Sequence, residues 1–215
     1  MRFFCYFITI VLILFMLRAV ADSNIIFNDA LFNKVRSEYD NEALERVRAW
    51  QELLSNNLDI PVDEKLYRVN NFFNELEFVD DIKHWGKDDY WATPVEFLAS
   101  DGGDCEDFVI AKYFSLKELG VPAEKLRLMY VTATRLRQAH MVLAYYEQSN
   151  SVPLVLDNIN RRILPASRRR DLLPVYSFNG DGLWLAKEQG RGQKVQQGGN
   201  NNLWNDLNQR MQLGD

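Results

Sequence analysis

Residues 101–122 read DGGDCEDFVIAKYFSLKELGVP, and this stretch predicts an apolar helix that begins near Cys105 and ends at Gly120. Unpaired backbone N–H groups and the positive end of the helix dipole lie at a helix N-terminus, where they favour a thiolate. The pair Gly102-Gly103 lets the backbone approach other groups closely. An inert structural cysteine would more naturally lie in the middle of such a helix. We therefore interpret Cys105 as a reactive nucleophile.

The first residues predict a secretory signal peptide, residues 1–21. Arg2 supplies a basic start, an apolar centre of about 15 residues follows, and Ala19 and Ala21 mark a cleavage site. An uncleaved membrane anchor is the alternative, but spanning a bilayer takes ~20 apolar residues. We expect cleavage, and no membrane insertion after it.

Loss of the signal peptide removes Cys5, so Cys105 becomes the only cysteine and no disulfide can form. A lone thiol in an oxidising compartment is prone to oxidation, and its retention indicates a chemical role. The signal peptide also removes two arginines, which takes the formal net charge from −5 to −7. A phosphate-binding surface needs clustered basic residues, and an acidic domain is repelled by phosphate, so the charge argues against nucleic-acid binding.

The remaining chain suits a single α+β domain, residues 22–186. Apolar residues at helical spacing predict one long helix over 32–57 and a second after Pro61, and Thr93 to Glu96 form a capping box. Residues 126–133, 139–146 and 153–159 predict three antiparallel strands, and Asn179 to Gly182 predict the turn of a terminal hairpin. We expect the N-terminal helices to pack on this small sheet, with the active site where the Cys105 helix meets it.

The tail, residues 187–215, is rich in Gln, Gly and Asn and predicts disorder. Its few apolar residues could form one amphipathic turn; they are Leu203, Trp204, Leu207 and Met211.

A catalytic cysteine needs an imidazole to accept its proton and a third group to orient that imidazole. His140 opens one predicted strand and Asp157 ends the next, whereas His84 has no comparable scaffold. If the two strands pair around the turn at 148–151 with the register centred near 148.5, Asp157 lies opposite His140. The pattern predicts a Cys105–His140–Asp157 triad.

Three segments carry a resemblance to a known family: residues 103–108 (GDCEDF), 139–143 (AHMVL) and 155–158 (VLDN). They resemble the bacterial transglutaminase-like cysteine proteinases, specifically the LapG type. The resemblance implies a papain/transglutaminase-like core and a periplasmic, calcium-dependent endopeptidase. Such an enzyme clips the N-terminal region of a large cell-surface adhesin, commonly at paired alanines, and releases cells from a biofilm. It also implies sequestration by an inner-membrane cyclic-di-GMP receptor of the LapD type.

The acids beside the cysteine, Asp104, Glu106 and Asp107, would raise the pKa of the thiol by repulsion if left bare. Calcium takes six to eight oxygen ligands and would neutralise them, so we predict a calcium site here. The resemblance supports Asp104 and Glu106 most firmly. Alternatively, the acids only complement the helix dipole.

Other features leave alternatives open. Tyr90 and Trp91 are candidates for a second oxyanion donor or for core aromatics, and the basic residues at 161–162 and 168–170 face an acidic partner or lie on a solvated loop. A transglutaminase or a peptidoglycan amidase would use the same thioester step. An inactive binding module is a further alternative, but the intact Cys, His and Asp argue against it.

Overall fold

The computed structural model describes residues 26–180, 182–185, 194–197 and 202–213. The predicted signal peptide lies outside these residues. Among the described helices, none has the length and apolar character needed to cross a bilayer.

Five helices form the N-terminal half of the chain. They are α1 (Asp29–Glu38), α2 (Asn41–Ser55), α3 (Val62–Phe73), α4 (Asp81–His84) and α5 (Pro94–Ala99). The prediction of one long helix over 32–57 is wrong, because the helix breaks at Tyr39 and restarts at Asp40. The side chain of Asp40 accepts a hydrogen bond from the backbone N–H of Ala43 at 2.7 Å, which caps α2. The capping box of Thr93 and Glu96 is present at the start of α5.

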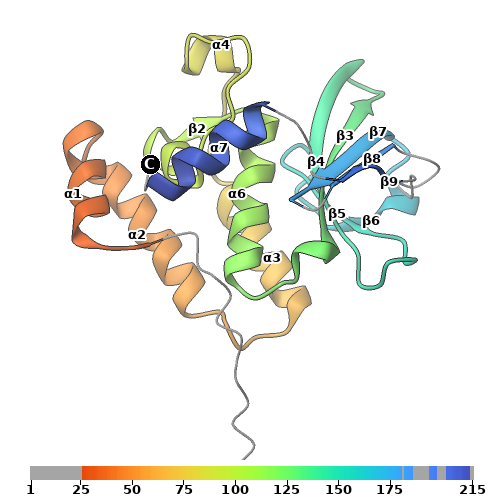
Figure 1. Ribbon diagram of the computed structural model, residues 1–215, viewed down its shortest axis with the longest axis horizontal. Helices are drawn as coiled ribbons and strands as arrows, with labels where there is room; N and C mark the ends of the chain where they lie inside the picture. Colours follow the sequence, from red (N-terminus) through yellow and green to blue (C-terminus); the bar gives the residue numbers. More distant parts are fainter. Residues whose placement is uncertain (1–25, 181, 186–193, 198–201, 214–215) are drawn as a thin grey trace, which may run out of the picture.

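The central helix α6 (Cys105–Glu118) stands between the other helices and the sheet (Figure 1). Every residue from Asp107 to Ser115 is buried, because α6 contacts the helical layer on one side and the sheet on the other. The chain leaves the helical conformation after α6 as predicted, because Gly120 adopts the left-handed region at φ 80°. Two short strands, β1 (Glu77–Phe78) and β2 (Gly102–Gly103), pair in parallel just before α6.

The sheet follows α6, after a 3-10 turn η1 (Ala123–Lys125). Its strands are β3 (Leu126–Ala133), β4 (Gln138–Tyr145), β5 (Leu154–Leu156), β6 (Leu164–Pro165), β7 (Leu172–Asn179), β8 (Gly182–Leu185) and β9 (Lys194–Gln197), in the spatial order β6-β5-β4-β3-β7-β8-β9. All neighbours are antiparallel. A second 3-10 turn, η2 (Ala166–Arg168), precedes β7. The predicted α+β class, the three strands and the terminal hairpin are confirmed.

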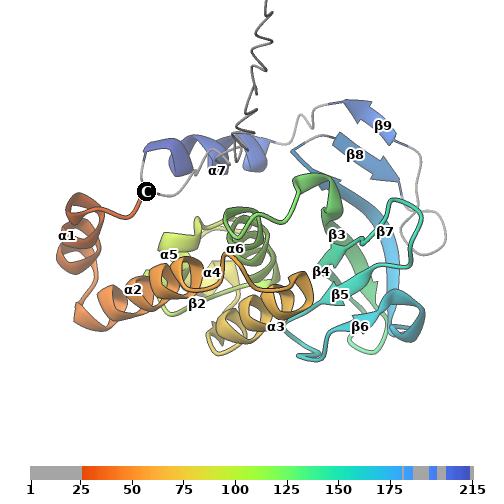
Figure 2. The same ribbon diagram turned by 90° about the horizontal axis from the view of Figure 1, so that it is seen from below.

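The last helix, α7 (Asn202–Leu213), crosses back over the helical half of the molecule (Figure 2). Trp204 is buried and stacks on Phe114 of α6 with ring centroids 5.8 Å apart. Arg210 donates hydrogen bonds to the carbonyl of Trp91 and to the carboxylate of Glu96. The expectation of a disordered tail is wrong for this segment, because its apolar residues pack on the core.

Candidate active site

Cys105 is the first residue of α6, and its neighbours build the cap of that helix. The side chain of Asp104 accepts from the N–H of Glu106 at 3.0 Å, and that of Asp107 accepts from the N–H of Asp104 at 3.2 Å. This is a reciprocal capping box. A Cβ atom on Gly103 would overlap the Asp107 carboxylate, so only glycine fits there. The sulfur is therefore held at a helix N-terminus.

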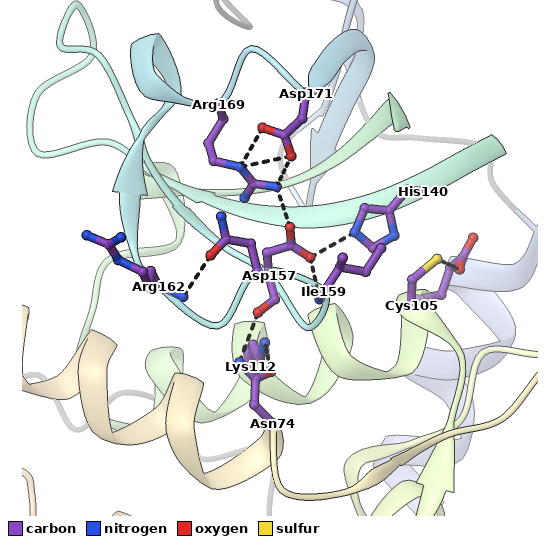
Figure 3. Close-up of polar contacts among 11 residues, drawn as sticks. Asn74, Cys105, Lys112, His140, Asp157, Ile159, Arg162, Arg169 and Asp171 are labelled. Atoms are coloured by element: carbon purple, nitrogen blue, oxygen red, sulfur yellow. Dashed lines mark hydrogen bonds and ion pairs between the residues drawn. The ribbon is translucent and has the colours of Figure 1, made fainter. Parts of the chain in front are cut away.

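His140 and Asp157 form a buried pair on the sheet side of the site. Nε2 of His140 lies 2.9 Å from Oδ1 of Asp157, and the exposed fractions of the two residues are 2% and 1% (Figure 3). The other nitrogen of the imidazole is on the side of the ring that faces Cys105 (Figure 3). The backbone N–H of Met141, which follows His140, hydrogen-bonds to the Cys105 thiol. The three residues that the sequence singled out thus lie at one place.

The predicted strand register is wrong by two residues. Leu143 pairs with Leu156, and Asp157 lies just beyond the last paired residue of β5 instead of opposite His140. Because side chains alternate between the two faces of a sheet, a shift of two keeps His140 and Asp157 on the same face. The pair forms despite the shift.

Arg169 was not expected in the site. Its Nη2 atom donates to Oδ2 of Asp157 at 2.6 Å and to Asp171 at 2.8 Å, and only 3% of the residue is exposed. Burial alone would raise the pKa of Asp157, but His140 and Arg169 outweigh burial and lower that pKa to about 2. Arg168 and Arg170 are exposed, as a solvated loop predicts, whereas Arg169 is turned inward to hold the carboxylate.

Two more buried side chains, Asn74 and Lys112, form a chain of hydrogen bonds that ends at the backbone of Asp157 (Figure 3). Nδ2 of Asn74, at the end of α3, donates to the carbonyl of Asp157 at 2.9 Å. Nζ of Lys112, on α6, donates to Oδ1 of Asn74 at 2.7 Å. Burial lowers the pKa of Lys112 to about 7. These bonds tie the segment after β5 to both α3 and α6.

The thiol of Cys105 makes its hydrogen bond with a carboxylate. Sγ donates to Oε2 of Glu106 at 2.7 Å, and the hydroxyl of Tyr130 donates to Oε1 of the same side chain at 3.0 Å. Burial first, and then the negative charges of Glu106 and Asp104, raise the pKa of the thiol well above its usual value. The bare carboxylates therefore oppose thiolate formation.

A fourth acid, Asp81, was missed by the sequence analysis and completes an acidic cluster. Oxygen atoms of Asp81, Asp104 and Asp107 lie within 4.8 Å of one another, while Glu106 groups with Asp104 and the thiol. Burial and neighbouring charges raise the pKa of Asp81 to about 6 and that of Asp104 to about 9. Oδ1 of Asp81 is buried and has no hydrogen-bond partner. No clear sequence signal marked Asp81, which is simply the acidic first residue of the four-residue helix α4.

This cluster fits a hard divalent cation. Calcium binds carboxylate oxygens, and a cation would supply the missing partner of Asp81 Oδ1 and relieve the repulsion that raises these pKa values. Asp107 is the least free of the predicted ligands, because its two oxygens already accept from the N–H groups of Ala92 and Asp104. Asp81 and Asp104 are the better placed donors.

Cys105 and His140 line one cleft of about 800 Å³. His84, Tyr90 and Trp91 do not line it. Trp91 is 1% exposed and stacks on Phe178 with centroids 5.7 Å apart, so it is a core aromatic. Tyr90 donates its hydroxyl to Glu96. Neither is a second oxyanion donor.

Comparisons with known proteins agree with this geometry. Residues 36–173 match the family of bacterial transglutaminase-like cysteine proteinases. The structure of Legionella pneumophila LapG shares 42% identity, covers 87% of this chain and 98% of its own, and superimposes with a TM-score of 0.74. The calcium-bound structure of the same protein shares 43% identity, covers 84% of this chain and 97% of its own, and has a TM-score of 0.74. The EGTA-treated structure shares 42% identity, covers 87% of this chain and 98% of its own, and has a TM-score of 0.75.

No curated protein matches the sequence. The family match spans more than half of the chain, and the LapG structures cover the fold from the helical layer to the sheet. The chain belongs to the bacterial transglutaminase-like cysteine proteinase family.

Proposed function

We propose that the protein is a calcium-dependent cysteine endopeptidase in which Cys105 is the nucleophile, His140 the base and Asp157 the group that orients the base. The observation that carries this assignment is the buried hydrogen bond of 2.9 Å between His140 and Asp157, which turns the other ring nitrogen toward Cys105. A triad needs this order of nucleophile, base and orienting acid.

The reaction follows from these positions. The thiol gives its proton to the ring nitrogen that faces it, and Sγ attacks the carbonyl carbon of the substrate. The C–N bond breaks, and the imidazolium gives the proton to the leaving amine. Water then gives a proton to the imidazole and attacks the thioester carbonyl. The C–S bond breaks, the acid leaves, and the imidazolium returns its proton to Sγ of Cys105. The backbone N–H of Cys105 is positioned to donate to the oxyanion.

His140 can serve both steps only in one orientation. Asp157 accepts a hydrogen bond from Nε2 of His140, which keeps the proton of the neutral imidazole on Nε2. The other ring nitrogen is then unprotonated and can act as the base. The thiol must also give up its hydrogen bond to Glu106 before it can meet His140.

Asp81 and Asp104, with Asp107 and Glu106, would hold the calcium. When bound there, calcium supplies positive charge that offsets the carboxylates around the thiol. The calcium-bound form of the Legionella relative supports this assignment.

We further infer the substrate, partner and location from the resemblance to the LapG type. The substrate is the N-terminal region of a large cell-surface adhesin, and its cleavage promotes biofilm dispersal. The partner is an inner-membrane cyclic-di-GMP receptor of the LapD type, and the location is the periplasm, reached through the signal peptide of residues 1–21.

The test compares wild type with Cys105→Ala on a purified adhesin N-terminal fragment in calcium. The variant should keep the wild-type circular dichroism spectrum and lose cleavage, and EGTA should suppress cleavage by wild type. Intact-mass detection of iodoacetamide on Cys105 at neutral pH reports thiol reactivity directly. Cleavage by a folded Cys105→Ala variant would refute the assignment.

A further inference from the structure

Exposed apolar side chains gather around the cleft that holds Cys105 and His140. The described residues include eleven large apolar side chains that are exposed, and four of them line this cleft. They are Phe78 (49% exposed), Ile82 (59%), Leu136 (52%) and Ile159 (51%). Scattered exposed apolar residues are ordinary, but a group around one concave site marks a binding surface. We call these four residues the apolar collar.

The collar has two sides that come from different parts of the fold. Phe78 ends β1 and Ile82 lies in α4, so both belong to the helical half. Leu136 lies in the turn between β3 and β4, and Ile159 follows β5, so both belong to the sheet half. Cys105 and His140 line the same cleft as both sides of the collar.

Two of the four residues are fixed beside the reacting groups by their backbones. The N–H of Ile159 donates to Oδ1 of Asp157 at 3.0 Å, on the oxygen that also contacts His140 (Figure 3). Phe78 pairs in β-register with Gly103, two residues before Cys105. The sides of the collar are therefore held at defined positions relative to the scissile bond.

The charge of the lining restricts what can bind. Among the residues that line the cleft there is no lysine or arginine. Its acids are Asp80, Asp81, Asp88, Asp104 and Glu106. A calcium ion offsets only part of this negative charge, so an acidic ligand segment is repelled.

We propose that the apolar collar is the substrate-recognition surface: it binds an extended polypeptide that carries apolar side chains on both sides of the scissile bond and no acidic residue near it. This proposal rests on the proposed function. Successive side chains of an extended chain point to opposite sides. A peptide that lies across Cys105 thus presents neighbouring side chains to the helical side and to the sheet side of the collar in turn.

The experiment uses three peptides that are identical except at the residues flanking a central Ala-Ala pair, which are leucine, serine or aspartate. Wild type should cleave the leucine peptide with kcat/KM about tenfold above the serine peptide, and the aspartate peptide least well. Leu136→Ala should reduce kcat/KM for the leucine peptide by about fivefold and that for the serine peptide by much less.

Leu58→Ala is the matched control, because Leu58 is 53% exposed and lies outside the cleft. It should cleave all three peptides like wild type. Equal cleavage of leucine and serine peptides by wild type, or an equal loss in Leu58→Ala and Leu136→Ala, overturns the proposal. If the collar served only to bind a protein partner, wild type would cleave the leucine and serine peptides equally.

Binding to the inactive Cys105→Ala protein separates this proposal from the proposed function. Fluorescence anisotropy should show tighter binding of the leucine peptide, and adding Leu136→Ala should weaken it. Selective binding without cleavage by wild type would refute the peptidase and leave the collar intact, whereas cleavage without selectivity would refute the collar alone.

Discussion

The guanidinium of Arg169 holds the Asp157 carboxylate through the oxygen that does not contact His140, at 2.6 Å. Asp157 thus has one oxygen fixed by each neighbour, and all three side chains are buried. A carboxylate held in this way cannot rotate without breaking a charge-assisted hydrogen bond. The orientation of the imidazole thus depends on Arg169, which does not line the cleft.

Replacing Arg169 should change the pH dependence of the enzyme. In Arg169→Ala, burial still raises the pKa of Asp157, and the lowering contribution of Arg169 is lost while that of His140 remains. The acidic limb of kcat/KM should move to higher pH, and kcat should fall by about 10–100-fold as the imidazole loses its alignment. Arg169→Lys keeps the charge and should restore part of the activity. The measurement is a pH–rate profile for each variant, with the exposed Arg170→Ala as control; an unshifted acidic limb in Arg169→Ala contradicts the role.

Calcium should raise the melting temperature more at pH 8 than at pH 5. The folded-state pKa values of Asp81 and Asp104, about 6 and about 9, lie above the unfolded value of about 3.9. Their contribution to stability without calcium is complete below pH 4 and is lost as pH rises through 6 and 9. Calcium needs ionised ligands, so its effect grows over the same range. At a hundredfold excess over Kd we expect about 3 kcal/mol, or an increase in melting temperature of about 6–12 °C.

Asp81→Asn tests whether this acid is a ligand. It should remove most of the calcium-induced increase in melting temperature, measured by differential scanning fluorimetry with calcium or EGTA. Asp88→Asn is the control, since Asp88 lines the same cleft but lies outside the cluster. An equal calcium response in Asp81→Asn and wild type would exclude Asp81.

Glu106→Gln should make the thiol more reactive in EGTA. After burial, the charge of Glu106 is the largest cause of the raised pKa of Cys105. Removing the charge lowers that pKa, and each unit gives about tenfold more thiolate at neutral pH. The rate of iodoacetamide alkylation, followed by intact mass, should rise severalfold, with Glu124→Gln as control. A slower rate would show that the carboxylate helps the thiol to ionise.

Trp204→Ala should destabilise the whole domain. Trp204 is buried against Trp91, Tyr113, Phe114 and Phe178. Removing such a ring costs about 3 kcal/mol or more and lowers the melting temperature by about 6–12 °C. Gln209→Ala, on the exposed side of α7, should have little effect. If α7 contributed nothing to the fold, the two variants would melt together.

Local signals predicted the elements that carry Cys105 and His140, because a capped helix start and alternating strands are encoded within a few residues. Long-range contacts were not readable. Asp81 and Arg169 join the site from segments that contact it only in the folded state, and nothing in their immediate sequence distinguishes them from surface residues. The register was misjudged by two because the prediction centred the pairing between residues 148 and 149, whereas the β4–β5 pairs are centred between residues 149 and 150.

Composition misled where packing decides the outcome. The Gln- and Asn-rich tail predicted disorder, yet Trp204, Leu207 and Met211 recur at helical spacing and bury against aromatic residues of the core. The prediction of a single long helix was wrong because a local cap overrides the apolar pattern. The apolar period continues across Tyr39, but the side chain of Asp40 caps a new helix.

Arg210 binds the carbonyl of Trp91, a residue 119 positions earlier in the chain, and the next residue, Ala92, donates its N–H to Asp107 in the acidic cluster. A nascent chain in which α7 has not yet left the ribosome lacks this contact. Contacts between such distant residues form late in folding. Docking of α7 thus sets the moment at which the segment beside the cysteine becomes fully supported.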